Sequence, residues 1–309
     1  MEALTSRLGT RFLIVTVVPN LLLIGYVALL LAAGAPAHSP SLTRAVKVLD
    51  GLTIRQVVVI LLGVLVISVA THPLQTPLIQ IVEGYWQGLP FGRVAANHFT
   101  ERFRNELHWA QNEVISPQAT EQSRAEARYR QSWLPPSEGY LLPTALGNTL
   151  WMGEIRAGER YGLDLSVALS RLAPLMEGPS LDDVNDRRNQ LDAAVRLCVA
   201  AGLATAAGVG LLLRYGPWLF LPLATYLLCW MSYRAAVAAA RGFCTSLAAA
   251  IDLNHLKLFD ALQLERPANL EEEYDLNQIL GMLFGDGLDS QGMANLIYVT
   301  KKTEESSAE

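Results

Sequence analysis

The sequence predicts an all-α integral membrane protein with four transmembrane helices and a helical cytoplasmic domain, and three observations support that fold class. Apolar and aromatic residue types make up 51% of the 309 residues and charged residues only 17%, against about 25% charged in an ordinary soluble domain. Four long stretches lack Asp, Glu, Lys and Arg, and a membrane-spanning helix needs roughly 20 mostly apolar residues. No segment shows the apolar–polar alternation of a β-strand.

Charge and cysteine content exclude two other classes of protein. The formal net charge is −5, so the chain lacks the basic surface of a nucleic-acid-binding domain, and no nucleic-acid partner is expected. The three Cys residues are too few for a disulfide framework. The composition therefore predicts the lipid bilayer as the first partner, and the preference for Arg over Lys is typical of a bacterial genome rich in G and C.

The first transmembrane helix is predicted at residues 12–35, after a cytoplasmic N-terminus at 1–11 that carries Arg7 and Arg11. A cleaved signal peptide is the alternative, because Ala35-Pro36-Ala37 resembles a cleavage site. The apolar stretch is over 20 residues long, which exceeds the apolar region of a signal peptide, of about 7–15 residues. We therefore expect an uncleaved first helix.

The second transmembrane helix is predicted at residues 56–72, after an external loop at 36–55. Its dense apolar part ends at Thr71-His72-Pro73, because Pro cannot continue a helix interior. A buried helix of a soluble protein is the alternative for this stretch, which is the least apolar at its ends.

The third and fourth transmembrane helices are predicted at residues 191–213 and 218–240, joined by an external turn at 214–217. The turn carries Tyr and Trp, which favour the membrane interface. The flanking Arg side chains can reach the headgroups from the ends of these short spans.

Lys and Arg outside the spans predict the orientation. Basic residues precede the first span, precede the third span and follow the fourth, and the side of the membrane that carries more of them is the cytoplasm. We therefore expect a multi-pass protein of the cell (plasma) membrane with both termini cytoplasmic. The residues that set this orientation are Arg7, Arg11, Arg187, Arg188, Arg234 and Arg241.

The segment 73–190 is predicted to be a helical cytoplasmic segment. Apolar spacing predicts a helix over 91–114, and Ser116-Pro117 predicts the start of a second helix that ends at Leu134, before a Pro-Pro pair. A short helix is expected over 143–158. Asp164 is placed to cap a helix over 165–176.

Two long helices are expected to leave the membrane. Ser180 predicts a helix start that continues into the third span, and the fourth span is predicted to continue to about Leu264. Asn269 is placed to cap a last helix that ends near Gly285. Together these form a cytoplasmic helical extension at 241–300, followed by a disordered tail at 301–309.

Gly, Pro and helix-capping residues are dense in one block of the cytoplasmic segment, where they predict turns. It reads Pro143-Thr144-Ala145-Leu146-Gly147-Asn148 and, further on, Arg160-Tyr161-Gly162-Leu163-Asp164-Leu165. The block, with Leu172-Ala173-Pro174-Leu175 and a long apolar hairpin after it, resembles a group of uncharacterised actinobacterial multi-span membrane proteins. The resemblance covers about residues 90–285 and implies a membrane location but no activity and no site residues.

Small residues recur every fourth position along the third span, and such rows let helices approach closely in lipid. The row can pack against the fourth span within one subunit, or form a subunit interface or pore lining in a homo-oligomer. A second small row is Ala200, Ala204 and Gly208. The candidate packing or interface residues are Cys198, Gly202, Ala206 and Gly210.

Asn20 is a candidate intramembrane polar site, because it follows Pro19 within the first apolar stretch and a polar group in hydrocarbon needs a partner. It can bond the carbonyls that Pro19 frees in its own helix. The alternative is a polar contact between helices or an ion path.

No catalytic, cofactor-binding or metal site is predicted. His98 and Glu101 lie three residues apart on one helix with His108 ten further on, and Asp252 and His255 share a helix face. A metal needs three or four converging ligands, so the simpler interpretation is a solvated helix surface. No motif of nucleotide binding, zinc binding or a nucleophilic serine is present.

Three functions are consistent with the sequence. The first is a non-enzymatic membrane scaffold, sensor or effector subunit that binds a cytoplasmic protein partner. The second is an oligomeric ion channel or pore, which the small-residue rows and Asn20 favour. The third is a membrane-associated enzyme, supported only by scattered His and carboxylate residues.

Overall fold

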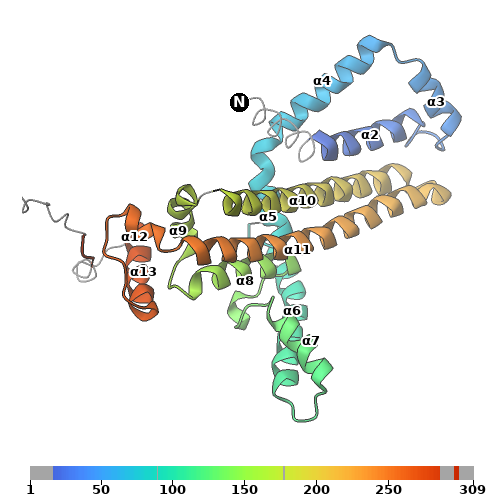
Figure 1. Ribbon diagram of the computed structural model, residues 1–309. Helices are drawn as coiled ribbons and strands as arrows, with labels where there is room; N and C mark the ends of the chain where they lie inside the picture. The colour runs from blue at the N-terminus through green and yellow to red at the C-terminus, as the bar shows by residue number, and fades with distance from the viewer. Residues whose placement is uncertain (1–16, 89, 177, 286–295, 299–309) are drawn as a thin grey trace, which may run out of the picture. The chain divides into compact units, whose positions relative to one another are not determined.

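The computed structural model describes residues 17–88, 90–176, 178–285 and 296–298, and this part of the chain is built from helices. Its α-helices are α2 Val18–Ala32, α3 Leu42–Asp50, α4 Ile54–Ala70, α5 Gln75–Glu83, α6 Gly92–Ile115, α7 Glu121–Gln131, α8 Ala145–Glu159, α9 Leu165–Leu172, α10 Pro179–Leu212, α11 Phe220–Asn254, α12 Lys257–Ala261 and α13 Leu270–Phe284. Figure 1 shows them in chain order. The one β-bridge within the described residues joins Leu264 and Tyr298, so the predicted all-α class is confirmed.

The chain divides into two compact units, which are described separately. Unit 1 comprises Met1–Asn148 and Arg187–Ala240, and unit 2 comprises Thr149–Asp186 and Arg241–Glu309. Unit 1 therefore holds the apolar helices and the α6–α7 hairpin, whereas unit 2 holds α9, α12, α13 and the polar ends of the two longest helices.

Two helices in the described residues are long and apolar enough to cross a membrane, α10 with 34 residues and the stretch Gly216–Asn254 with 39. A third candidate arises if α3 and α4 are taken as one span bent by 103°. Helix α2 has 15 described residues, about 22 Å by helical rise, and residues 12–16 of the predicted first span lie outside the described residues. The apolar character that predicts a membrane protein is thus present, with two to three candidate spans rather than four.

In unit 1, the two apolar hairpins meet at one end. Tyr215, in the turn between α10 and α11, donates from its hydroxyl to the carbonyl of Pro36 at 2.8 Å. Leu30 and Ala35 pack with Leu212 in one buried apolar cluster. The loop after α2 and the α10–α11 turn therefore lie together.

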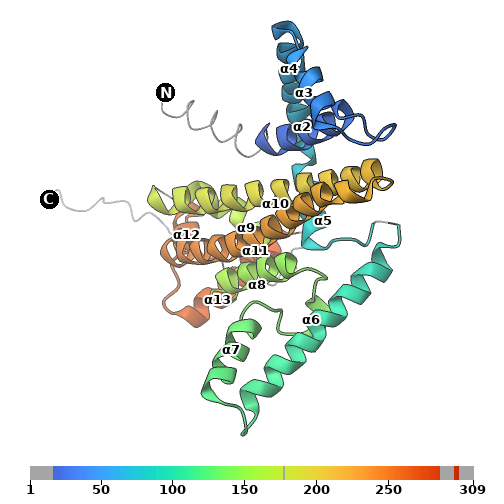
Figure 2. The same ribbon diagram turned by 90° about the vertical axis from the view of Figure 1, so that its right-hand side faces the viewer.

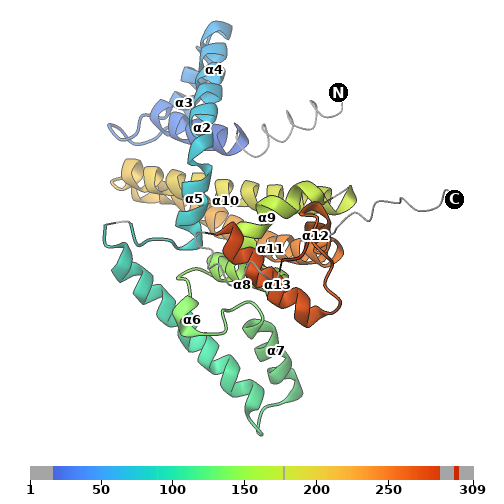
Figure 3. The same ribbon diagram turned by 90° about the vertical axis from the view of Figure 1, so that its left-hand side faces the viewer.

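The α6–α7 hairpin has its own small core and a charged surface (Figures 2 and 3). Leu107, Leu134 and Leu141 are buried together, with Phe103 against them. Helix α6 matches the predicted 91–114, but α7 begins at Glu121 rather than after Ser116. Thr120 caps it, accepting a bond from the backbone N–H of Ser123 at 3.1 Å.

Three other predicted boundaries were wrong. Helix α9 ends at Leu172 and a 3₁₀ turn at Ala173–Leu175 follows, because Pro174 cannot continue the helix. Helix α11 ends at Asn254 rather than near Leu264, and the short α12 follows. The loop predicted at 36–55 contains helix α3. The predicted tail at 301–309 lies outside the described residues.

Several caps agree with the sequence prediction. The Asp164 side chain accepts from the backbone N–H of Ser166, and Asn269 accepts from that of Glu272. Helix α10 begins at Pro179 and continues without a break through the apolar stretch. In unit 2, α9, α12 and α13 gather at the end of α11 (Figures 1 and 3) around the buried side chains Leu172, Ile251, Leu258, Phe259 and Leu280.

Candidate functional site

The densest set of ionisable and hydrogen-bonding side chains among the described residues lies in unit 2. It joins the turn after α8, the end of α11 and the first two turns of α13. We call it the His255 cluster, and it consists of Arg160, Tyr161, Asp252, His255, Glu273 and Asn277.

His255 and Glu273 form the centre of the cluster. The Nδ1 atom of His255 lies 2.5 Å from Oε1 of Glu273, and their side chains are 15% and 5% exposed. An ionised carboxylate only accepts hydrogen bonds, so Nδ1 carries the proton between them. Charged residues are almost never this buried unless they are paired, and each of these two supplies the other's partner.

Tyr161 covers the imidazole. Its ring stacks on that of His255 with centroids 4.0 Å apart and planes 18° from parallel. Its hydroxyl donates to Oδ1 of Asp252 at 2.9 Å. Burial, and then the bond and charge of Asp252, raise the pKa of Tyr161 above its ordinary value, since the neutral phenol is the form that donates. Asp252 is also 3.6 Å from the Arg160 guanidinium.

Asn277 fixes the turn that carries Tyr161. Its side-chain amide donates to the Tyr161 carbonyl at 2.8 Å, and Asn277 is only 1% exposed. The next residue, Gly162, has a φ of +70°, and a Cβ there would collide with the backbone of Tyr274. Gly is therefore required at this position both for its conformation and for its closeness to α13.

The His255 cluster does two things chemically. It can hold a proton between an imidazole and a carboxylate, and it fastens three chain segments by bonds between side chains. Glu273 and Asn277 come from α13, and their partners lie 18 and 116 residues away along the chain. The sequence analysis placed Asp252 and His255 on one face. It gave no sign of these partners, because Glu273 is one of three consecutive Glu residues.

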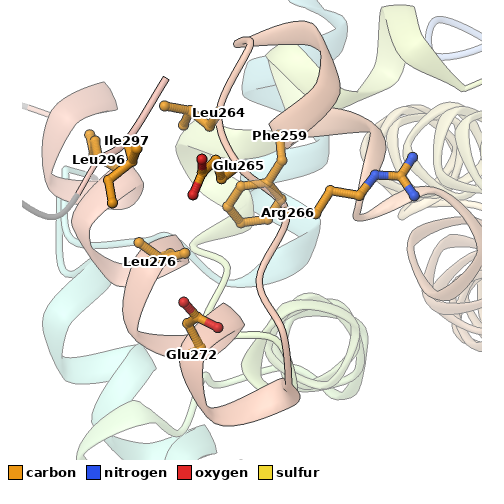
Figure 4. Close-up of a pocket in the computed structure, with 8 residues that line it drawn as sticks. All are labelled: Phe259, Leu264, Glu265, Arg266, Glu272, Leu276, Leu296 and Ile297. Carbon is orange, nitrogen blue, oxygen red and sulfur yellow. The ribbon is translucent and has the colours of Figure 1, made fainter. Parts of the chain in front are cut away.

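A small pocket lies elsewhere in unit 2, and Figure 4 shows its lining. It has a volume of about 60 Å³, room for a few waters and far less than the roughly 300–1,000 Å³ of an ordinary ligand site. The backbone N–H of Glu265 donates to the Ile297 carbonyl at 2.9 Å along one wall. The Arg266 guanidinium points away from the pocket (Figure 4) and pairs with Asp260 at 2.7 and 2.6 Å. This pair lowers the pKa of Asp260.

The His and carboxylate residues of α6 lie on its charged surface. His98 makes an edge contact with Phe99, Glu101 pairs with Arg104, and His108 lies 3.0 Å from Glu138. Within the described residues, no group of three or more His, Cys, Asp or Glu side chains converges as a metal would require.

In unit 1, Asn20 makes a polar contact between two apolar helices. Its side-chain amide donates to Oγ of Ser68 at 3.2 Å and to Oγ1 of Thr71 at 3.1 Å. Ser68 is fully buried. Of the two arrangements open to Asn20 in the sequence, the structure has the contact between helices, here α2 with the end of α4.

The small-residue row of α10 is covered over only half its length. Sγ of Cys198 lies 3.7 Å from Sγ of Cys229 on α11, and a Cβ at Gly202 would lie 3.6 Å from the same sulfur. Ala206 and Gly210, further along the row, are exposed. The second row, Ala200, Ala204 and Gly208, is buried instead.

The first half of the block around Pro143 builds the start of α8 in unit 1. Asn148 is fully buried and bonds both backbone groups of Leu142, at 2.7 and 2.9 Å. The Tyr233 hydroxyl accepts from the backbone N–H groups of Ala145 and Leu146 at 3.1 and 3.4 Å. These residues satisfy the free N–H groups at a helix start, as the predicted turn-building role requires.

Comparison with known proteins gives no further identification. No protein-family model, curated protein sequence or solved structure matches the chain.

Proposed function

We propose that the chain is a non-enzymatic integral membrane protein, a scaffold, sensor or effector subunit whose unit 2 is a cytoplasmic helical module. In this proposal four helices cross the plasma membrane: the stretch ending with α2, then α4, α10 and α11. The resemblance to actinobacterial multi-span membrane proteins belongs to the same proposal.

One observation supports the four-span arrangement above the others. The loop after α2 and the α10–α11 turn are joined by the Tyr215–Pro36 hydrogen bond and by the Leu30–Leu212 packing. Two helical hairpins that cross a membrane from the same side place their connecting turns on the same opposite side. The joined turns are the two that the charge distribution assigns to the exterior.

The non-enzymatic role is supported by the way unit 2 uses its ionisable groups. His255 and Glu273 bind each other in its interior, and Tyr161 and Asp252 complete the same network. Those bonds hold α13 to the end of α11. They give unit 2 a defined surface for a cytoplasmic protein partner.

The orientation is tested by labelling single cysteines in intact cells with a membrane-impermeant maleimide. We expect Ser39→Cys to be labelled from outside and Glu126→Cys only after permeabilisation, because both side chains are exposed. A reporter fused after Glu309 should be cytoplasmic. The parent chain is the control for its three native Cys. Labelling of Glu126→Cys in intact cells would overturn the proposal.

An oligomeric ion channel is the second candidate, and the uncovered half of the α10 row favours it. Ala206 and Gly210 leave a smooth surface on which a second copy could pack closely. Potassium flux from vesicles containing the purified protein separates the two functions. The scaffold predicts the flux of protein-free vesicles, whereas a channel predicts a flux that rises with the amount of protein and falls in Gly210→Leu.

A further inference from the structure

Helix α3 has two faces of opposite character. It is nine residues long, and Leu42, Val46 and Leu49 recur at the spacing that places side chains on one helix face. These three are 70%, 53% and 50% exposed. Thr43, Lys47 and Asp50 have the same spacing one position further along and are also exposed.

The contacts of α3 leave that apolar face uncovered. Ala45, which lies to one side of it, is 2% exposed. The chain is fastened to the end of α2 by the Ser41 N–H, at 3.1 Å from the Ala33 carbonyl, and by the Arg44 guanidinium, at 3.4 Å from the same atom. A nine-residue helix is too short to be stable in water by itself. An apolar environment for Leu42, Val46 and Leu49 would supply the missing stabilisation.

The direction of α3 fits one such environment. Its axis bends by 103° from that of α4, and Figure 1 shows it linking the ends of α2 and α4. When α4 runs along the membrane normal, α3 therefore lies nearly in the membrane plane. The loop before α3 bonds to Tyr215, and Tyr and Trp of the 215–218 turn are residues that favour the headgroup level.

We propose that α3 is an interfacial helix that lies in one leaflet, with Leu42, Val46 and Leu49 among the upper acyl chains and Thr43, Lys47 and Asp50 toward water. The occupant of its apolar face is lipid. The apolar face continues into that of α4, where Val58, Leu61 and Leu62 are also exposed, and Lys47 can reach lipid phosphates from the polar side. This inference rests on the proposed membrane function.

The test is a nitroxide scan of the full-length protein in phosphatidylcholine–phosphatidylglycerol vesicles. Labels are placed at Val46→Cys and Leu49→Cys on the apolar face and at Thr43→Cys and Lys47→Cys on the polar face. Power saturation then compares collisions with oxygen, which concentrates in the acyl region, and with a water-soluble nickel chelate. The background has Cys198, Cys229 and Cys244 replaced by Ala.

We expect the oxygen-to-nickel collision ratio to be several-fold higher at positions 46 and 49 than at 43 and 47. Equal ratios on both faces would place α3 in water. Low collision rates with both agents at 46 and 49 would mean that protein, such as a second copy, covers the face. A ratio that rises steadily along the helix would indicate a re-entrant segment. Each of these three outcomes overturns the proposal.

Two controls keep the result interpretable. Leu62→Cys in α4 should give a high ratio; if its label meets the nickel chelate freely, the membrane function itself fails, whereas a deep Leu62 label with water-exposed 46 and 49 sinks only the α3 proposal. If the background without cysteine does not fold, the labels are read in the wild-type background with the signal of the treated parent subtracted, since Cys198 and Cys244 are buried.

Discussion

Buried polar side chains join helices in both units, and the chemistry differs between the two. In unit 1, the neutral amide of Asn20 bonds the hydroxyls of Ser68 and Thr71. In unit 2, an imidazole meets a carboxylate at His255 and Glu273. A charge at the bilayer centre is costly, and neutral amides and hydroxyls are the polar groups that apolar helices tolerate. The contrast therefore follows from the solvent that we propose for each unit.

The strength of the two contacts should differ as well. Hydrogen bonds between helices in membranes are worth about 0.6–2 kcal/mol, because the separated helices also find partners. Breaking one side of a buried charged pair costs about 3–5 kcal/mol, because the other charge stays behind. Substitutions at the two places can break or sharpen the comparison.

The largest effect is expected at His255. His255→Leu leaves the Glu273 carboxylate, which is 4% exposed, without its partner, and we expect a loss of about 3–5 kcal/mol. Glu273→Leu should cost about 1–3 kcal/mol, because the imidazole can become neutral. Thermal unfolding in detergent, followed by proteolysis of unit 2, measures both.

The double variant His255→Leu/Glu273→Leu is the matched control. We expect it to be more stable than His255→Leu alone, because neither charge is then left unpaired. If the double variant loses the sum of the two single losses, the pair contributes through packing rather than through charge.

The next largest effect is expected at two glycines of α10. A Cβ at Gly208 would collide with the hydroxyl of Tyr26, while Gly210 has nothing within 4 Å. We expect Gly208→Leu to cost about 1–3 kcal/mol from overpacking. Gly210→Leu, two residues away, should leave the thermal midpoint of the monomer in detergent unchanged or higher, since Leu favours a helix. Equal losses in both variants would show that a second copy covers Gly210.

A smaller effect is expected at Asn20. Asn20→Leu should cost about 0.6–2 kcal/mol, and a double-mutant cycle with Ser68→Ala isolates the part that belongs to their hydrogen bond. A zero coupling energy would mean that Thr71 alone carries the contact. A loss as large as that of His255→Leu would remove the contrast between the two units.

The fold was predicted best where a local signal sets the structure. Asp164 and Asn269 cap helices as expected because a cap needs only its own side chain and the next backbone N–H groups. Helix α7 was misplaced, since Ser116-Pro117 carries the same local signal as Thr120 and the extended backbone of Ser116 ends α6 instead. Helix α3 was missed because a search for uncharged stretches stops at Arg44 and Lys47, although its apolar spacing was present.

The candidate site could not be predicted from the sequence, because contacts between distant segments create it. The end of α11 at Asn254 has no Gly or Pro to mark it, and His255 beyond it is held by Tyr161 and Glu273. The α10 row reads as one uniform stripe in the sequence. Only the fold divides it, into Cys198 and Gly202 against α11 and the exposed Ala206 and Gly210.

The smallest effect is expected from the pH dependence of unit 2. The pKa of Tyr161 is raised above its ordinary value of 10.0 in the folded chain, so the folded state favours the protonated phenol. Its contribution to stability is complete below that value and is lost as the pH rises through the raised pKa. Tyr161→Phe keeps the ring that stacks on His255 but removes the titrating group. We therefore expect its thermal midpoint to fall less steeply than that of the parent between about pH 9 and pH 11. Lys and Arg titrate equally in both chains, so parallel curves would show that the Tyr161 hydroxyl keeps no link to Asp252.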